Sequence, residues 1–120
     1  MLAGFYKIMA ELREAGEYKV QVELNREHVI YQAHFPGSPI TPGVCILQIS
    51  QELLEKYTGR RLRMVKAKNI KFLHVLSPVE HPCPVFSFVC VEAESGLRAM
   101  VSVLEASTVF ATLSVEYRYC

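Results

Sequence analysis

The sequence predicts an α+β fold in which an antiparallel sheet of five or six strands wraps round one central helix at about residues 44–57. Runs with a two-residue apolar period stand before and after a single helix-like segment. The connections between these runs are short, which favours antiparallel pairing. The helix-like segment is apolar on nearly all sides in its first turns, so it must be buried there. A sheet curved round a helix is a natural way to bury both.

Two strands are expected before the helix. Residues 5–13 alternate between apolar and polar positions, with Tyr6, Ile8, Ala10 and Leu12 on one face. Ala15-Gly16 breaks this run, and residues 18–24 then alternate again, so the two runs are expected to form a hairpin. Residues 25–33 are interpreted as a connector, with one helical turn at 26–28.

The remaining elements follow the same reasoning. The helix is expected to end at Thr58-Gly59, because glycine is common just beyond the last turn of a helix. Strand-like runs follow at residues 61–73, 85–94, 97–107 and 108–119, and the last of these has the clearest alternation. The chain of 120 residues is 51% hydrophobic, which is enough for one core, so we predict a single domain over residues 1–120.

Composition excludes several functional classes. The formal net charge is +1 and 21% of the residues are charged, which argues against a nucleic-acid-binding protein. No window approaches the ~18 apolar residues of a membrane span, and charges interrupt the apolar start before a signal-peptide core could form. The four cysteines lack zinc-site spacing, so we expect thiols in a reducing compartment, a cytoplasmic location and no metal site.

The segment that carries the functional signal is His34-Phe35-Pro36-Gly37-Ser38-Pro39-Ile40-Thr41-Pro42-Gly43-Val44. It joins one titratable side chain to a loop that opens onto the apolar helix. Its three prolines each fix φ and remove a backbone donor, so the loop is expected to be stiff and to place His34 firmly. An imidazole titrates near neutrality and can both take and return a proton. A lone loop histidine would more often be structural, so the catalytic role that we favour for His34 depends on what this segment resembles.

This segment resembles the active-site sequence of the (3R)-hydroxyacyl-acyl-carrier-protein dehydratases of dissociated fatty acid synthesis, which are hot-dog folds that act as dimers. That family reads His-Phe-Pro-Gly-x-Pro-x-x-Pro-Gly-Val, followed by a catalytic Glu on the helix and a Gln one turn later. At these two positions the present chain has Gln48 and Glu52, so the residue types are exchanged. Residues 69–72, Asn-Ile-Lys-Phe, followed by Ser77-Pro78, resemble the family's second signature.

The resemblance implies a role for each matching residue. His34 would be the base that removes a proton next to the thioester carbonyl. The backbone N–H groups of Gly43 and Val44, at the start of the helix, would bind the negative charge that develops on the thioester oxygen, and Phe35 and Pro42 would lie beside the substrate. A carboxamide cannot supply a proton as the family's Glu does, so Gln48 would instead hydrogen-bond the hydroxyl or the carbonyl. Glu52, one turn away, would replace the lost acid through a water or would pair with Lys56.

Basic residues are concentrated just after the helix. A run of this kind is usually a solvated strand face, but carrier proteins are acidic and basic patches steer their encounter with enzymes. In the context of the resemblance we predict a carrier-protein docking surface, made by Arg60, Arg61, Arg63, Lys66 and Lys68.

Three functions remain open at this stage. The first is a dehydratase that converts 3-hydroxyacyl thioesters on acyl carrier protein to trans-2-enoyl thioesters, with an altered acid residue and no cofactor. The second is a non-dehydrating subunit that binds an acyl thioester or completes a heterodimer. The third is a hot-dog thioesterase, in which water attacks the carbonyl. For each we expect a dimer or a multiple of dimers, no nucleic-acid partner and no membrane partner.

Overall fold

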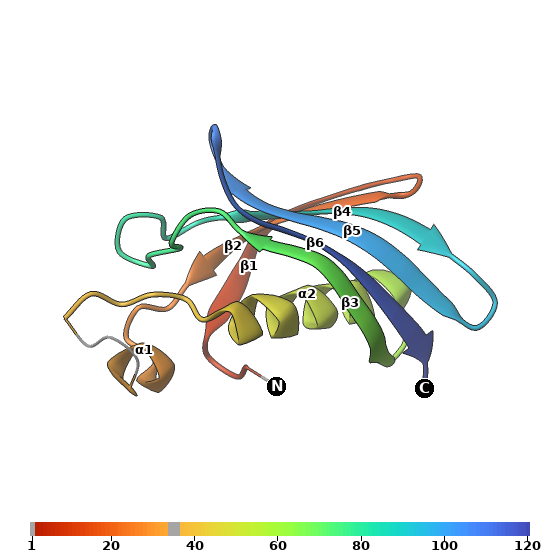
Figure 1. Ribbon diagram of the computed structural model, residues 1–120, viewed down its shortest axis with the longest axis horizontal. Coiled ribbons are helices and arrows are strands. Elements are labelled where there is room, and N and C mark those ends of the chain that lie inside the picture. Colours follow the sequence, from red (N-terminus) through yellow and green to blue (C-terminus); the bar gives the residue numbers. More distant parts are fainter. Residues whose placement is uncertain (1, 34–36) are drawn as a thin grey trace.

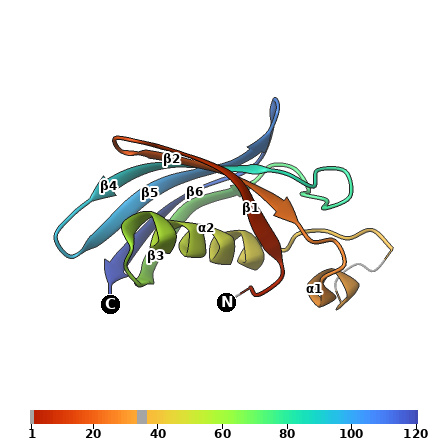
Figure 2. The ribbon, with the colours of Figure 1, turned by 180° about the vertical axis from the view of Figure 1, so that it is seen from behind.

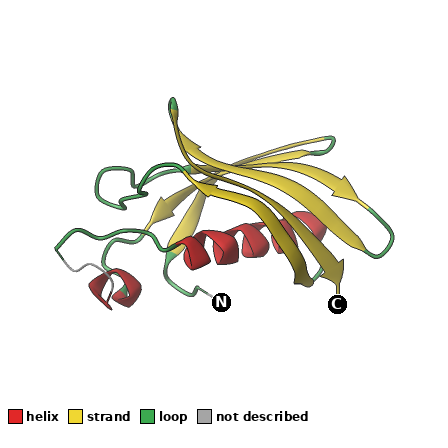
Figure 3. Ribbon diagram, viewed as in Figure 1, coloured by secondary structure: helices red, strands yellow, loops and turns green. Residues whose placement is uncertain are grey.

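The protein is described by a computed structural model, which covers residues 2–33 and 37–120. A six-stranded antiparallel sheet curves round one long helix (Figures 1 and 3). The expected α+β architecture and the long central helix are confirmed. The elements are β1 (Tyr6–Glu14), β2 (Glu17–Leu24), α1 (Val29–Ala33), α2 (Gly43–Thr58), β3 (Leu62–Phe72), β4 (Val85–Glu92), β5 (Gly96–Glu105) and β6 (Thr108–Tyr119).

The strand order in the sheet is β1-β2-β4-β5-β6-β3. After the β1–β2 hairpin the chain leaves the sheet, forms both helices, and returns at the opposite edge as β3, which pairs with β6. Helix α2 lies against the concave side of the sheet, as the front and back views both show (Figures 1 and 2). Strands β1 and β3 are therefore the two edges of the sheet. No helix among the described residues is long and apolar enough to cross a membrane.

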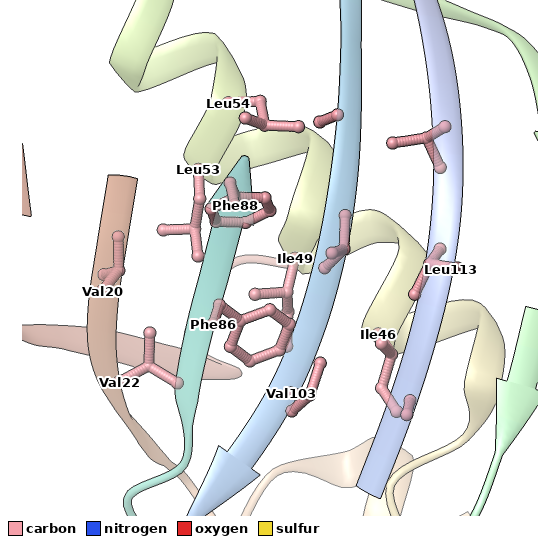
Figure 4. Close-up of a cluster of buried hydrophobic side chains, with 14 of the residues drawn as sticks. Val20, Val22, Ile46, Ile49, Leu53, Leu54, Phe86, Phe88, Val103 and Leu113 are labelled. Atoms are coloured by element: carbon pink, nitrogen blue, oxygen red, sulfur yellow. The ribbon is translucent and has the colours of Figure 1, made fainter. Parts of the chain in front are cut away.

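The core lies between α2 and the inner face of the sheet. The side chains that meet there are fully or almost fully buried (Figure 4), and they include Val20, Val22, Ile46, Ile49, Leu53, Leu54, Phe86, Phe88, Val103 and Leu113. Burying one such side chain stabilises a fold by roughly 1.5–3 kcal/mol. The apolar first turns of the helix are covered as expected, because Cys45, Ile46 and Ile49 are all buried. This core fixes the position of α2, on which the candidate site stands.

The alternation expected in the first strand is wrong beyond its middle. Ile8 pairs with Val22, but the next paired residue is Ala10, opposite Gln21, so a bulge lies between Ile8 and Ala10. One extra residue in a strand turns every later side chain to the other face. Leu12, which the sequence pattern puts beside Ile8, is accordingly on the outer face and 53% exposed.

The connector contains its helix three residues later than expected, at Val29–Ala33 instead of 26–28. The reason is local hydrogen bonding by polar side chains. Asn25 Oδ1 accepts from the Glu27 backbone N–H at 3.0 Å, which makes a turn, and His28 Nδ1 accepts from the Ile30 N–H at 3.1 Å. Helix α1 then begins after His28.

Candidate functional site

Helix α2 has a second face that lies outside the apolar core, where the edge strand β1 reaches it through the Tyr6 hydroxyl. Val44, Gln48 and Glu52 are spaced by four residues and so lie in line on this face. Val44 is 71% exposed, and Gln48 and Glu52 are half-buried. These are three of the residues that the sequence singled out. The fold therefore places them on one accessible stripe of the helix, because the apolar positions between them are buried against the sheet.

The N-terminal end of α2 offers free backbone donors. Pro42 is the N-cap and has no side-chain cap hydrogen bond, and its carbonyl accepts from the N–H groups of Cys45 at 3.0 Å and Ile46 at 3.2 Å. Among the described residues nothing accepts from the N–H groups of Gly43 or Val44. Unpaired N–H groups at a helix start, together with the helix dipole, favour a negatively charged or polarised oxygen.

Gly43 also has a steric role that the sequence did not reveal. A Cβ atom at Gly43 would lie 2.6 Å from Cζ of Phe72, so the ring of Phe72 fills the space that a side chain would need. An open groove of about 330 Å³ lies here, lined by residues 40–43, 46 and 72–76. The glycine thus leaves room for this ring, and the binding role of its N–H stays a prediction.

Gln48 and Glu52 contact each other directly. Gln48 Nε2 donates to Glu52 Oε2 at 3.0 Å. The same carboxylate accepts from the backbone N–H of Leu2 at 2.9 Å and from the Tyr6 hydroxyl at 2.9 Å. Burial, followed by the hydrogen bond to Glu52, raises the pKa of Tyr6, so its hydroxyl stays protonated and remains a donor at neutral pH. The expected pairing of Glu52 with Lys56 is not what the structure shows, because Lys56 Nζ contacts Glu11 Oε2 at 2.6 Å.

A groove lies beside Gln48 and Glu52, between α2 and the start of β3. It has a volume of about 540 Å³ and is lined by Gln48, Gln51, Glu52, Glu55, Arg61, Leu62, Arg63, Met64 and Cys120. The same groove as Gln48 and Glu52 therefore holds two of the basic residues that are predicted to dock a carrier protein, Arg61 and Arg63. A ligand in this groove would meet the amide of Gln48 and two guanidinium groups.

The other predicted docking residues are spread along β3 and just before it. Arg60 lies over the ring of Tyr119, with Cζ 3.8 Å from the ring centre. Lys66 is opposite Glu116 and Lys68 opposite Ser114 on the neighbouring strand β6. All five basic residues are exposed, and none makes an ion pair within 4.0 Å with the part of the chain that the structure describes. Their charges are therefore available to a partner.

The predicted base, His34, and its neighbour Phe35 lie outside the described residues, so their roles stay predictions. The structure does show how the chain is held on both sides of that segment. The Tyr31 hydroxyl is 2.8 Å from Thr41 Oγ1, and both residues are buried. The Thr41 N–H donates to the Leu76 carbonyl at 2.9 Å. These bonds anchor the flanks to α1 and to the loop after β3.

Sequence reasoning missed Tyr6 as a neighbour of the site. It contacts Glu52 across 46 positions of sequence, and only the pairing of β1 at the sheet edge brings the two together. In the sequence this tyrosine has the pattern of an ordinary strand residue, and nothing local to it points to the helix. Among residues 2–33 and 37–120 no group of three His, Cys, Asp or Glu side chains is arranged to hold a metal ion.

The curved antiparallel sheet round a single helix, with its site face on that helix, defines a protein of the hot-dog class. The sequence matches the family model for ApeI dehydratase, described as ApeI-like, over residues 10–83. This is more than half of the chain, so the chain belongs to the ApeI-like dehydratase family, and the resemblance to hydroxyacyl dehydratases is confirmed.

Two curated relatives are 3-hydroxyacyl-acyl-carrier-protein dehydratases FabZ. The protein of Clostridium acetobutylicum is 36% identical over 56 residues, which are 41% of this chain and 40% of that protein. The protein of Latilactobacillus sakei is 30% identical over 73 residues, which are 54% of this chain and 52% of that protein. The chain thus spans about half of the length of these relatives, or less.

Solved structures show the same fold at low sequence identity. The dehydratase heterocomplex ApeI:P from Xenorhabdus doucetiae matches with a TM-score of 0.73 and 15% identity, over 93% of this chain and 96% of that one. A thioesterase from Staphylococcus aureus matches with a TM-score of 0.68 and 7% identity, over 95% and 92%. A Streptococcus mutans protein bound to acetyl CoA matches with a TM-score of 0.66 and 15% identity, over 100% and 92%. At these identities the matches establish the fold alone.

Proposed function

We propose that this protein removes water from 3-hydroxyacyl thioesters carried by acyl carrier protein and yields trans-2-enoyl thioesters. The observation that carries the proposal is the uncapped start of α2. There the N–H groups of Gly43 and Val44 have no partner among the described residues, directly after the motif that contains His34. Membership of a dehydratase family and the FabZ relatives support the reaction class.

The proposed reaction uses residues of this chain in defined roles. His34 takes a proton from the carbon next to the thioester carbonyl, and negative charge develops on the thioester oxygen. That oxygen accepts hydrogen bonds from the N–H groups of Gly43 and Val44. The bond between carbon 3 and its oxygen then breaks, and the leaving hydroxyl takes the proton back from His34 and departs as water. Gln48 hydrogen-bonds the hydroxyl and holds it in place.

A dimer is part of the proposal. Strand β3 is an edge strand, and unpaired edges are prone to pair with another chain. Phe72, Leu73 and Val75, at and just beyond the end of β3, are 55%, 51% and 59% exposed, which leaves apolar surface for a partner to cover. Two such edges related by a two-fold axis would pair their free backbone groups with each other.

A cytoplasmic location is also part of the proposal. The thiols are unpaired in the described residues, which supports it.

A second candidate function is a subunit that binds an acyl thioester without dehydrating it, within a heterodimer. One observation favours it, because the amide of Gln48 already donates to Glu52 and offers no acidic proton to a leaving hydroxyl. The ApeI:P structure is described as a heterocomplex, which supports a second chain as partner.

The experiment that separates these functions is incubation of the purified protein with 3-hydroxyacyl-carrier protein, followed by mass spectrometry. Loss of water identifies a dehydratase, hydrolysis identifies a thioesterase, and an unchanged bound substrate identifies a binding subunit.

Variants of the site residues sharpen this experiment. His34→Ala should abolish any turnover. Gln48→Glu should raise dehydration strongly, because it restores a proton donor, whereas Gln21→Glu on the exposed face of β2 serves as the charge-matched control. No dehydration by the wild type or by Gln48→Glu, in a protein that still binds substrate, would leave the binding subunit as the function.

A further inference from the structure

The chemistry of Gln48 and Glu52 decides which end of the Gln48 amide faces Glu52. A carboxylate has only acceptors, so the group that contacts it must be the amide nitrogen, and the 3.0 Å contact is a hydrogen bond from Nε2 to Oε2. The amide oxygen must then point away from Glu52. It makes no hydrogen bond with the described residues, and it is not among their buried polar atoms that lack partners. The oxygen is therefore not buried, and Gln48 lines the groove between α2 and the start of β3.

Glu52 is itself held from outside the helix. The Leu2 N–H and the Tyr6 hydroxyl donate to the two oxygens of the carboxylate, each at 2.9 Å. These donors come from strand β1 and the residues before it, so the carboxylate is fixed between two elements of the fold. A fixed acceptor removes the freedom of the Gln48 amide to turn over, which a glutamine exposed to water would otherwise have.

We infer that Glu52 is a positioning residue, which holds Gln48 so that the site presents an amide oxygen, a hydrogen-bond acceptor, to the ligand. The ligand group that this arrangement selects is a hydroxyl donor at carbon 3 of the acyl chain. A saturated acyl chain would leave the amide oxygen without its partner and would bind less tightly. The inference rests on the proposed function for the acyl thioester, and it adds the preference for the hydroxylated form and the residue responsible.

The test measures binding of two probes to the full chain by calorimetry. The probes are 3-hydroxyoctanoyl pantetheine and octanoyl pantetheine, each with an amide in place of the thioester so that neither reacts. The wild type should bind the hydroxylated probe roughly tenfold more tightly, which is the effect of one well-placed hydrogen bond. In Glu52→Leu the amide loses its acceptor, so the ratio of the two affinities should fall to about one.

Two matched variants separate positioning from a structural effect. Tyr6→Phe removes one bond to Glu52 but keeps the contact with Gln48, so the tenfold ratio should persist. Glu52→Gln should also retain it, because the new amide oxygen can accept from Gln48 while the Tyr6 hydroxyl reverses and accepts from the new amide nitrogen. If Glu52→Leu kept the tenfold ratio of affinities for the two probes, or if Glu52→Gln lost it, the inference would be overturned.

A measurement on the wild type alone keeps the test independent of how the variants fold. In NMR spectra the side-chain carbonyl carbon of Gln48, assigned by its absence in Gln48→Met, should shift with the hydroxylated probe and not with octanoyl pantetheine. A response of the amide protons instead would show that the nitrogen faces the ligand and would overturn the inference. Equal binding of the two probes would also overturn it and leave acyl binding intact, whereas binding of neither would contradict the proposed function itself.

Discussion

The two ends of helix α2 are completed in different ways. At the C-terminal end the carbonyls have partners, since the Gly59 N–H donates to Glu55 at 2.9 Å and Arg13 donates to the carbonyls of Tyr57 at 3.1 Å and Lys56 at 3.2 Å. At the N-terminal end Pro42 provides no side-chain cap, and Val44 is 71% exposed. One end is closed by the chain's own groups, and the other is left open.

Because of this difference, the C-terminal end of α2 contributes to stability, whereas the N-terminal end is available to bind a ligand. Backbone groups at helix ends cost free energy when they are buried without partners, so closing the C-terminal end stabilises the fold. An open N-terminal end contributes less to stability, but its N–H groups are available to a ligand oxygen. We therefore expect changes at the N-terminal end to affect ligand binding and turnover, and changes at the C-terminal end to affect stability.

The largest effect is expected from Gly43→Ala at the open end. The new methyl group would lie 2.6 Å from Phe72, so the ring or the start of the helix must shift. Misplacing an oxyanion donor costs about 100-fold in kcat. Stability should change little, because Phe72 is 55% exposed and its ring can move. Turnover of the thioester, or affinity for it, measures the loss, and Phe72→Ala in the same chain should partly restore it. Full activity in Gly43→Ala would contradict the prediction that the added methyl group displaces these donors.

Alkaline pH should weaken the anchor of the loop before α2. Burial raises the pKa of Tyr31 from 10.0 to about 12. The unfolded chain then loses this proton near pH 10, whereas the folded protein keeps it until about pH 12, so the stabilisation is complete below pH 10 and is lost between these values. The loss should be on the order of 2 kcal/mol. Urea unfolding at stepwise pH, compared with Tyr31→Phe, isolates this residue from the other tyrosines. Identical pH slopes in both proteins would contradict the prediction.

Just beyond the closed end, Arg60 and Arg61 are predicted to attract an acidic carrier protein. Because Arg61 also lines the groove beside Gln48, the test uses Arg60 and Lys68, which do not. Reversing these two residues to Glu should weaken carrier-protein binding about tenfold at low salt and leave small thioester analogues unaffected. The effect should shrink at high salt, where exposed charges are screened. Surface plasmon resonance at two ionic strengths measures it, and Lys19→Glu on the exposed face of β2 is the charge-matched control for Arg60→Glu alone. Equal loss on small analogues would indicate a change in the site instead of a docking surface.

The smallest effect is expected at the closed end, from Gly59→Ala. Gly59 has φ +69°, and a Cβ atom added there would meet no neighbouring group within 4 Å, so the cost comes from the left-handed backbone alone. Such strain destabilises a protein by about 1 kcal/mol. Thermal unfolding should detect this loss while the activity of the folded protein is unchanged. Reduced turnover without reduced stability would show that the two ends are not separate in function.

Much of the fold could be predicted from the sequence, and the errors have physical causes. Apolar alternation located the strands, and the buried face of α2 was visible in its composition. The face reversal after Ile8 was not, because a bulge depends on how the neighbouring strand pairs and leaves no local signature. The partner of β3 was also set by the sheet as a whole, since β3 pairs with β6 across the chain.

For the candidate site, too, one part could be predicted from the sequence and another part could not. The residue types could be predicted from the sequence, namely the motif from His34 to Val44 and the exchanged Gln48 and Glu52. Covalent order also fixes the spacing of Gln48 and Glu52 on one helix face. What these side chains contact could not be predicted from the sequence. Phe72 fills the space beside Gly43, and Tyr6 reaches Glu52 from the sheet edge. Such contacts join residues far apart in sequence, and they form only when packing of the core brings the edge strands against α2.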